Sequence, residues 1–198
     1  SELFYNDLNL SANTEYCYTV TAYDAADNES SPSPLSCMTT YEPANDAIPW
    51  NEVFTYADGT ITHTNPTWSL NGSVNLEVIN NKLKGQHLAL VSSFLTGSID
   101  VSGETCIDIT MDCEADGGLE TVDYVAANYR LDYGPWIRID SLNGSFPPTT
   151  MSVSDVDVNG NSTLELIVNI YNTGNDEIYY LDNVSVTSGT CGSDTESP

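Results

Sequence analysis

Short runs in which apolar and polar residues alternate, separated by clusters of turn-forming residues, recur along most of this 198-residue chain. Alternation with a period of two sends successive side chains to opposite faces and is typical of half-buried β-strands. Clear examples are Leu76–Ile79, Cys106–Met111, Trp136–Ile139 and Leu164–Ile170. No stretch sustains the 3.6-residue period of an amphipathic helix. Many short strands without helices favour an all-β fold in which two sheets pack face to face.

The strand signals predict a two-sheet antiparallel β-sandwich over residues 51–187 and a smaller, incomplete β unit over residues 1–41. Residues 42–50 contain two prolines and are predicted to form a short stiff linker. Residues 188–198 are expected to be a tail or a linker to a further domain. Within the sandwich the sequence predicts a hairpin turn at Asn71-Gly72, a strand at His87–Val91, and a hairpin through Asn159-Gly160-Asn161 that joins strands at 156–158 and 164–170.

The first unit contains an alternating run from Leu10 to Asp24, a turn-rich segment, and a second short strand from Leu35 to Thr40. Leu10 lies six residues before Tyr16, which opens the run Tyr-x-Tyr-x-Val-x-Ala. This pattern resembles the last third of a fibronectin type III domain, in which such a leucine marks a tyrosine corner. The resemblance implies a remnant of an Ig-like sandwich, whose open sheet edges need a partner surface.

The cysteines indicate an oxidising compartment. If the first two strands pair about a centre near Asp27, Cys17 lies opposite Cys37 and within reach of a disulfide; the alternative is two free thiols on an outer face. With five cysteines, at least one lacks an intrachain partner, and the pairing among Cys106, Cys113 and Cys191 stays open. The absence of any Cys-x-x-Cys motif disfavours a structural zinc site. We therefore expect an extracellular protein, secreted or attached to a cell surface.

The charge balance limits the partners. The chain has 29 acidic and four basic residues, a formal net charge of −25. Such a field repels phosphate, so a nucleic-acid partner is excluded. No apolar run is long enough to cross a bilayer, so membrane insertion is not expected. An acidic surface of this kind suits salty or calcium-rich water outside cells.

Several short motifs in the larger unit belong together. Glu52 stands two residues before Phe54, Gly59 and Trp68 follow, and the last strand reads Tyr-Tyr-Leu-Asp-Asn-Val-x-Val from Tyr179. The segment Arg130–Trp136 matches an aspartate-glycine-tryptophan hairpin. Together they resemble the jelly-roll carbohydrate-binding modules of secreted bacterial polysaccharide hydrolases and related modules of surface adhesins. The resemblance implies a jelly-roll β-sandwich and an extracellular location.

The closing strand draws attention to Asp182. A straight strand would place Ile178, Tyr180, Val184 and Val186 on one face and Asp182 with them, pointing inward. A buried carboxylate is costly without a cation or several donors. The resemblance implies a structural calcium ion held by Glu52 and Asp182, with Asn183 or a backbone carbonyl. The alternative is an aspartate that caps backbone amides at a strand end.

Two other acidic segments are weaker calcium candidates. Asp155-x-Asp157-x-Asn159-Gly160 copies the start of a calcium loop, but position 12 is Leu166 instead of glutamate, so we interpret it as a hairpin turn. The acidic residues between Asp112 and Asp123 lack regular spacing and are interpreted as a solvated loop.

A sugar site needs exposed aromatic rings beside amide, carboxylate and guanidinium groups. Trp136, which follows Gly134-Pro135 at a predicted hairpin tip, is the favoured ring. The other candidates are Trp68, Tyr124, Tyr129 and Tyr133, with Asn128, Arg130 and Asp132 as polar partners. Aromatic residues of sandwiches also fill cores, which is the alternative for each of them.

No catalytic set stands out, since no Gly-x-Ser-x-Gly elbow precedes a helix and carboxylate pairs carry no signal among 29 acids. The leading hypothesis is a non-catalytic binding or adhesion module that recognises a polysaccharide or cell-surface glycan and carries a structural calcium ion. One alternative is a repeating subunit of an extracellular fibre or adhesin stalk, in which the chain contacts other copies or neighbouring domains and an unpaired cysteine such as Cys191 links them. A second alternative is an ancillary region of a secreted polysaccharide hydrolase.

Overall fold

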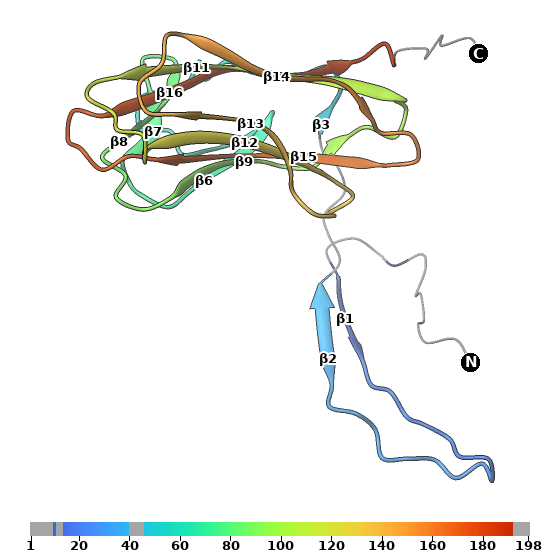
Figure 1. Ribbon diagram of the computed structural model, residues 1–198. Coiled ribbons are helices and arrows are strands. Elements are labelled where there is room, and N and C mark those ends of the chain that lie inside the picture. The colour runs from blue at the N-terminus through green and yellow to red at the C-terminus, as the bar shows by residue number, and fades with distance from the viewer. Residues whose placement is uncertain (1–9, 11–13, 40–45, 192–198) are drawn as a thin grey trace. The chain divides into compact units, whose positions relative to one another are not determined.

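The computed structural model describes residues 10, 14–39 and 46–191 (Figure 1). These residues form sixteen strands and no helix, which confirms the all-β prediction. The described part of the chain accordingly contains no helix of the length and hydropathy needed to cross a membrane. The chain divides into two compact units, Ser1–Pro43 and Ala44–Pro198.

The first unit is a hairpin of β1 (Glu15–Tyr18) and β2 (Ser36–Thr39), which pair antiparallel. Cys17 lies opposite Cys37 in this ladder, and the two form a disulfide with their Cα atoms 4.0 Å apart, the pairing that the register predicted. Backbone bonds beyond the strands extend the hairpin, and Asp24 accepts the amides of Ala26 and Asn28 to close its turn.

The resemblance of this unit to a fibronectin type III domain is not confirmed. Residues 11–13 of the strand expected from Leu10 to Asp24 lie outside the described residues, and the described remainder is assigned as a strand only over Glu15–Tyr18. The apolar side chains of the hairpin are largely exposed, with Val20 at 70%, Leu35 at 65% and Met38 at 74% of full exposure. Among the described residues of this unit, the two-stranded ribbon has no second layer against which these side chains could be buried.

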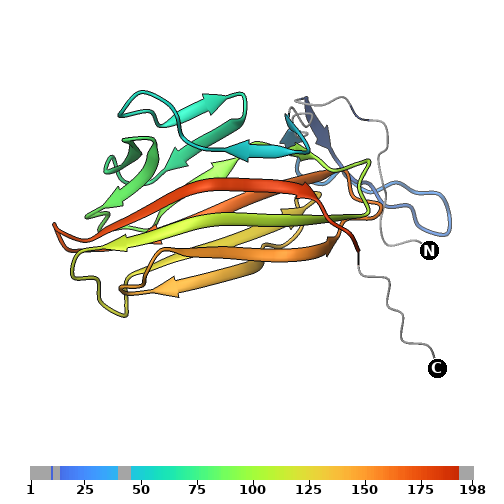
Figure 2. The ribbon, with the colours of Figure 1, turned by 90° about the horizontal axis from the view of Figure 1, so that it is seen from above.

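The second unit is a sandwich of two sheets, seen as two layers in Figure 1 and from above in Figure 2. The first sheet, here called the β12 sheet, has the order β13-β12-β15-β9-β6-β5, with β10 beside β15 and β3 beside β10. All of its pairs are antiparallel except β3 with β10. Its strands are β3 (Asp46–Ala47), β5 (Thr62–Thr64), β6 (Thr67–Asn71), β9 (Ser92–Thr96), β10 (Ile99–Asp100), β12 (Tyr124–Leu131), β13 (Ile137–Asn143) and β15 (Thr163–Tyr171).

The second sheet, here called the β11 sheet, has the order β14-β11-β16-β8-β7, with β4 also paired to β16. Its strands are β4 (Trp50–Glu52), β7 (Leu76–Ile79), β8 (Lys82–Gln86), β11 (Cys106–Asp116), β14 (Thr149–Asp157) and β16 (Ile178–Ser188). The two-sheet antiparallel jelly-roll sandwich predicted from the sequence is thereby confirmed.

The core lies between the sheets and follows from strand alternation. On β15 the inward residues Leu164, Leu166, Val168 and Ile170 are fully buried, and the residues between them are partly exposed. Phe54 packs edge-on against Trp68 and Phe94, at ring separations of 5.8 and 5.6 Å. Burial of large apolar side chains on both inner faces supplies most of the stabilisation of such a fold.

The structure also shows how the remaining cysteines pair. Cys106 at the start of β11 pairs with Cys191 just after β16, with Cα atoms 5.4 Å apart. Cys113 is the free cysteine of the described residues and is buried. Burial, and then the charge of Asp112, raise the pKa of its thiol to about 12, so it is a poor nucleophile. An intermolecular link through Cys191 was therefore a wrong prediction.

Three local predictions were wrong for topological reasons. The turns at Asn71-Gly72 and at 159–161 do not close hairpins, because β6 and β7, and likewise β14 and β15, belong to different sheets. His87–Val91 is not a strand: His87 and Ala89 have φ angles of 48° and 55°, and Asn172 accepts the amides of Leu88 and Ala89. Turn chemistry specifies a change of direction, whereas tertiary pairing decides the sheet.

Residues 42–45 of the predicted linker lie outside the described residues, whereas residues 46–50 are part of the sandwich. Asp46 and Trp50 are buried in the sandwich, and Asp46 accepts hydrogen bonds from the indole of Trp50 at 3.1 Å and from the amide of Thr67 at 2.7 Å. Residues 46–50 therefore belong to the second unit.

Candidate functional site

The outer face of the β12 sheet carries an unusual set of side chains. On β12 the outward residues are Tyr124, Ala126, Asn128 and Arg130, because Val125, Ala127 and Tyr129 point into the core. The register places these four beside Tyr171, Asn169, Ile167 and Glu165 of β15. On the other side, β13 adds Asn143, Ser141 and Arg138. We call this set the β12 face.

One end of the β12 face is aromatic. The rings of Tyr124 and Tyr171 stack with centroids 5.9 Å apart and an interplanar angle of 29°. A pocket of about 260 Å³ opens beside Tyr124, and its lining includes Arg138, Asn143 and Asn169. A flat ring next to amide and guanidinium groups can stack on the apolar face of a sugar while hydrogen-bonding its hydroxyls.

The middle of the face is held by hydrogen bonds between its own polar groups. The Arg138 Nε donates to Asn128 Oδ1 at 2.9 Å, and the Ser93 hydroxyl donates to Asn169 Oδ1 at 2.7 Å. These bonds fix both amide oxygens and orient the amide NH₂ groups. Arg138 itself is exposed and lines the pocket beside Tyr124. The middle of the face therefore offers oriented donors.

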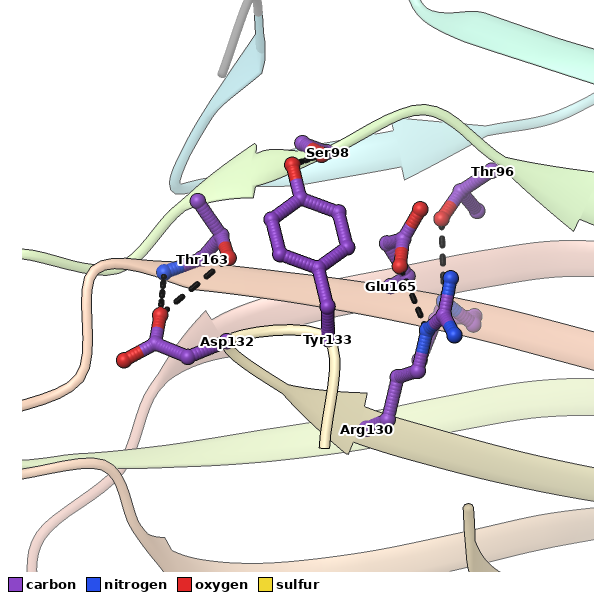
Figure 3. A network of polar contacts seen from close by, with 8 residues as sticks. Thr96, Ser98, Arg130, Asp132, Tyr133, Thr163 and Glu165 are labelled. Atoms are coloured by element: carbon purple, nitrogen blue, oxygen red, sulfur yellow. Dashed lines mark hydrogen bonds and ion pairs between the residues drawn. The ribbon is translucent and has the colours of Figure 1, made fainter. Parts of the chain in front are cut away.

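The other end of the face is built around Arg130 (Figure 3). Its Nε donates to Glu165 Oε2 at 2.6 Å, and the guanidinium lies 4.5 Å from the ring centroid of Trp136 and 5.6 Å from that of Tyr133. The hydroxyls of Tyr133 and Ser98 are 2.6 Å apart. Trp136 retains 37% of its exposure, so the side chain remains accessible.

Hydrogen bonds hold in place the loop that carries these rings. Asp132 and Tyr133 both have positive φ, at 45° and 58°, a conformation that costs energy for residues other than glycine. Asp132 Oδ1 accepts the amides of Ser162 and Thr163 at 3.0 and 2.9 Å and the Thr163 hydroxyl at 3.2 Å, as Figure 3 shows for Thr163. The carboxylate thus fixes a strained turn that presents Tyr133 and Trp136.

The two aromatic ends are separated along one strand. Tyr124 and Arg130 lie six residues apart on β12, which corresponds to about 20 Å at the rise of an extended strand. The β12 face is therefore long enough for several sugar units in a row. Both arginines of the chain lie on it, in a protein with only four basic residues.

Not every predicted sugar-contacting residue reaches this face. Arg130, Tyr133 and Trp136 do. Asn128 points toward this face but is buried at 8% exposure, and Trp68 and Tyr129 are core residues with 1% and 9% exposure. The prediction that these two rings contact sugar was wrong, because strand alternation turns Tyr129 inward and the Trp68 indole donates a hydrogen bond to Glu52 in the core. Sequence reasoning missed Arg138, Asn169 and Tyr171, which the polar positions of β13 and β15 could have indicated.

Glu52, a predicted calcium ligand, is 1% exposed and faces the core opposite Val184. Protein donors satisfy its carboxylate: Oε1 accepts the Phe54 amide, and Oε2 accepts the Trp68 indole and, at 2.9 Å, the Tyr56 hydroxyl. Burial, and then the bond to Glu52, raise the pKa of Tyr56 to about 12. Three donors remove the need for a cation at this position.

Asp182 and Asn183 lie elsewhere. Relative to β11, one extra residue of β16 is inserted between Ser185 and Asp182, and Asn183 has a φ of 49°. This β-bulge resets the alternation, so Leu181 and Val184 are both buried while Asp182 points to the outer face of the β11 sheet. The predicted inward direction of Asp182 was wrong, and the structure does not bring Asp182 and Glu52 together.

Asp182 instead lines a pocket of about 290 Å³ with Lys82, Asp112 and Glu114 among its other walls. Lys82 Nζ lies 2.6 Å from Glu114 Oε2, and Asn183 Nδ2 donates to Asp112 Oδ2 at 2.9 Å. Burial raises the pKa of Asp182, although the Asn183 amide and the charge of Lys82 oppose that shift. The amide of Asn183 donates to Asp182 Oδ1 at 2.8 Å, in line with the capping alternative.

Comparisons with known proteins locate the fold. No protein-family model matches the chain, and neither does any curated protein. A structure from endo-acting O-glycanases that prominent members of the human gut microbiota express to initiate mucin breakdown matches with a TM-score of 0.50 at 11% identity, covering 71% of this chain and 99% of that one. A family 4 carbohydrate-binding module matches with a TM-score of 0.47 at 12% identity, covering 68% of this chain and 96% of that one. A family 61 module in complex with β-1,4-galactotriose matches with a TM-score of 0.43 at 6% identity, covering 69% of this chain and 90% of that one. At 11% identity, the likeness to the first of these structures shows the fold alone.

Proposed function

We propose that the second unit is a non-catalytic glycan-binding module and that the β12 face holds the ligand. The observation that carries the proposal is a row of oriented polar groups with aromatic rings at both ends, Tyr124 and Tyr171 at one and Tyr133 and Trp136 at the other. Its length favours a linear polysaccharide that lies along β12. The two disulfides are in keeping with an extracellular location.

The chemistry of the face selects among glycans. Sugar rings stack on exposed aromatic side chains, and their hydroxyls bond to the amide of Asn169 and to Arg138, which the buried Asn128 orients. Arg130 is neutralised by Glu165, and the whole chain carries a net charge of −25. A polysulfated ligand would be repelled by this field. The favoured ligand is therefore a neutral polysaccharide.

Titration calorimetry against a panel of neutral and anionic soluble polysaccharides tests the proposal. Trp136→Ala and Tyr124→Ala are each expected to weaken binding about tenfold, which corresponds to one lost stacking contact of about 1.4 kcal/mol. Tyr180→Ala is the matched control, because Tyr180 is a partly exposed tyrosine that lines the pocket on the other sheet. Absence of binding across the panel, or equal loss in the control, overturns the proposal.

A fibre subunit is the second candidate function, favoured by the exposed apolar residues of the β1–β2 hairpin. Val20, Leu35 and Met38 would be buried if another chain paired with or packed on the hairpin. Size-exclusion chromatography with light scattering over a concentration series tests assembly. Growth beyond the monomer that Met38→Ser reverses supports this function, and a monomer at all concentrations counts against it.

A further inference from the structure

Three carboxylates meet between two loops of the sandwich. Glu120 and Asp123 lie in the loop between β11 and β12, and Glu177 lies in the loop between β15 and β16. Each places a carboxylate oxygen within 4.8 Å of the other two. Both loops lie at the same end of the sandwich, on the left in Figures 1 and 2.

Two of the three acids are buried. Asp123 is fully buried, Glu177 is 4% exposed, and Glu120 lies at the surface. Like charges brought this close raise the free energy of the ionised state. The cluster therefore needs donors, protons or a cation.

Protein donors satisfy only part of it. Glu177 Oε2 accepts the amides of Thr173, at 2.9 Å, and Gly174, and Asp123 Oδ2 accepts the amide of Glu120 at 2.8 Å. The other oxygen, Asp123 Oδ1, is buried and has no hydrogen-bond partner, the sole side-chain atom in this state among the residues described. An orphaned buried carboxylate oxygen points to a ligand in the cluster.

We propose that Glu120, Asp123 and Glu177 bind a calcium ion. All three ligands offer hard carboxylate oxygens, the chemistry that selects calcium or magnesium over zinc or copper. Calcium takes six to eight oxygens in flexible geometry, so backbone carbonyls and water complete the shell. For an extracellular module the expected dissociation constant is about 0.1–1 mM.

The site would hold together two loops that already approach closely. A Cβ at Gly117, whose φ is 93°, would lie 1.9 Å from the carbonyl oxygen of Asp176. Asp123 directly precedes Tyr124, and the loop of Glu177 directly follows Tyr171. The ion therefore anchors the ends of the two strands that carry the stacked tyrosines.

Calorimetry and thermal unfolding of the chelator-treated protein test the site. Calcium is expected to bind with one-to-one stoichiometry and to raise the unfolding temperature, and sodium chloride of matched ionic strength is expected to give a much smaller rise. Asp123→Asn and Glu177→Gln should weaken calcium binding at least tenfold. Glu120→Gln, at an exposed position, keeps the test valid if a buried variant fails to fold.

Asp116→Asn is the matched control, since it removes one exposed charge from the end of β11 and leaves the cluster intact. The proposal is overturned if calcium gives no binding heat at millimolar concentration, if sodium chloride reproduces the whole thermal shift, or if the three cluster variants bind calcium as tightly as the control does.

Discussion

Glu52 and Asp123 are both buried carboxylates of one sandwich, yet their surroundings differ. Glu52 receives hydrogen bonds from a backbone amide, an indole and a phenol, whereas Asp123 keeps one oxygen without any donor and has two further carboxylates beside it. A buried acid indicates a cation only where no protein donor or positive charge pairs with its charge and lone pairs. Calcium is therefore expected at the loop carboxylates and not at the closing strand.

The largest expected effect on stability comes from removing the Glu52 carboxylate. Glu52→Leu leaves three donors without an acceptor, two of them buried, so the free energy of unfolding should fall by at least about 3 kcal/mol. Urea denaturation measures it, and Glu104→Leu, at a partly exposed glutamate, is the control. The loss should be the same with calcium and with chelator. A loss that appears only with calcium would show that Glu52 does hold an ion.

Asp123→Asn should have effects of opposite sign in the two conditions. In chelator it removes one of three crowded charges, and we expect the unfolding free energy to rise by about 1 kcal/mol. With saturating calcium it removes a ligand, and the variant should be less stable than the original chain by about 1–2 kcal/mol. Thermal unfolding in both buffers measures this change of sign in the stability effect. A variant that is destabilised equally in both would mark Asp123 as purely structural.

Much of the architecture could be predicted because period-two alternation and turn residues are local signals. The register about Asp27 predicted the Cys17–Cys37 bond, and Arg130–Trp136 was placed correctly in the connection between two paired strands. The sheet to which a strand belongs could not be predicted, because β6 to β7 and β14 to β15 are crossovers with hairpin-like turns. The residues of a turn do not determine which sheet the next strand joins.

The sites were harder to predict for a related reason. A single bulge at Asp182 and Asn183 reverses which residues of β16 face the core, and no residue type marks it unambiguously. The donors of Glu52 include Trp68, sixteen residues away, and the acids of the loop cluster are 54 residues apart at Asp123 and Glu177. Whether a carboxylate is satisfied is a property of the tertiary structure.

Tyr56 gives a pH test of the satisfied site. Its pKa in the folded protein is about 12, above the ordinary value of 10, because burial and the bond to Glu52 favour the neutral phenol. A raised folded-state pKa means that this stabilisation is complete below pH 10 and is lost as pH rises from 10 to 12. Tyr56→Phe should flatten the stability profile in that window and leave calcium binding unchanged. An unaltered alkaline slope would contradict the assignment.

The smallest effect is expected at Asp182, now on the outer face. Its pKa is raised, so the ionised form is disfavoured in the folded state, and the associated stability is present at low pH and lost as pH rises through the folded-state pKa. Asp182→Asn should therefore be neutral or stabilising at pH 7, within about 0.5 kcal/mol, as for most surface substitutions. Calcium titration of this variant should match that of the original chain, because Asp182 and the loop cluster share no residue. A loss of the calcium response in Asp182→Asn alone would return the ion to the closing strand and leave Asp123 Oδ1 to be explained without it.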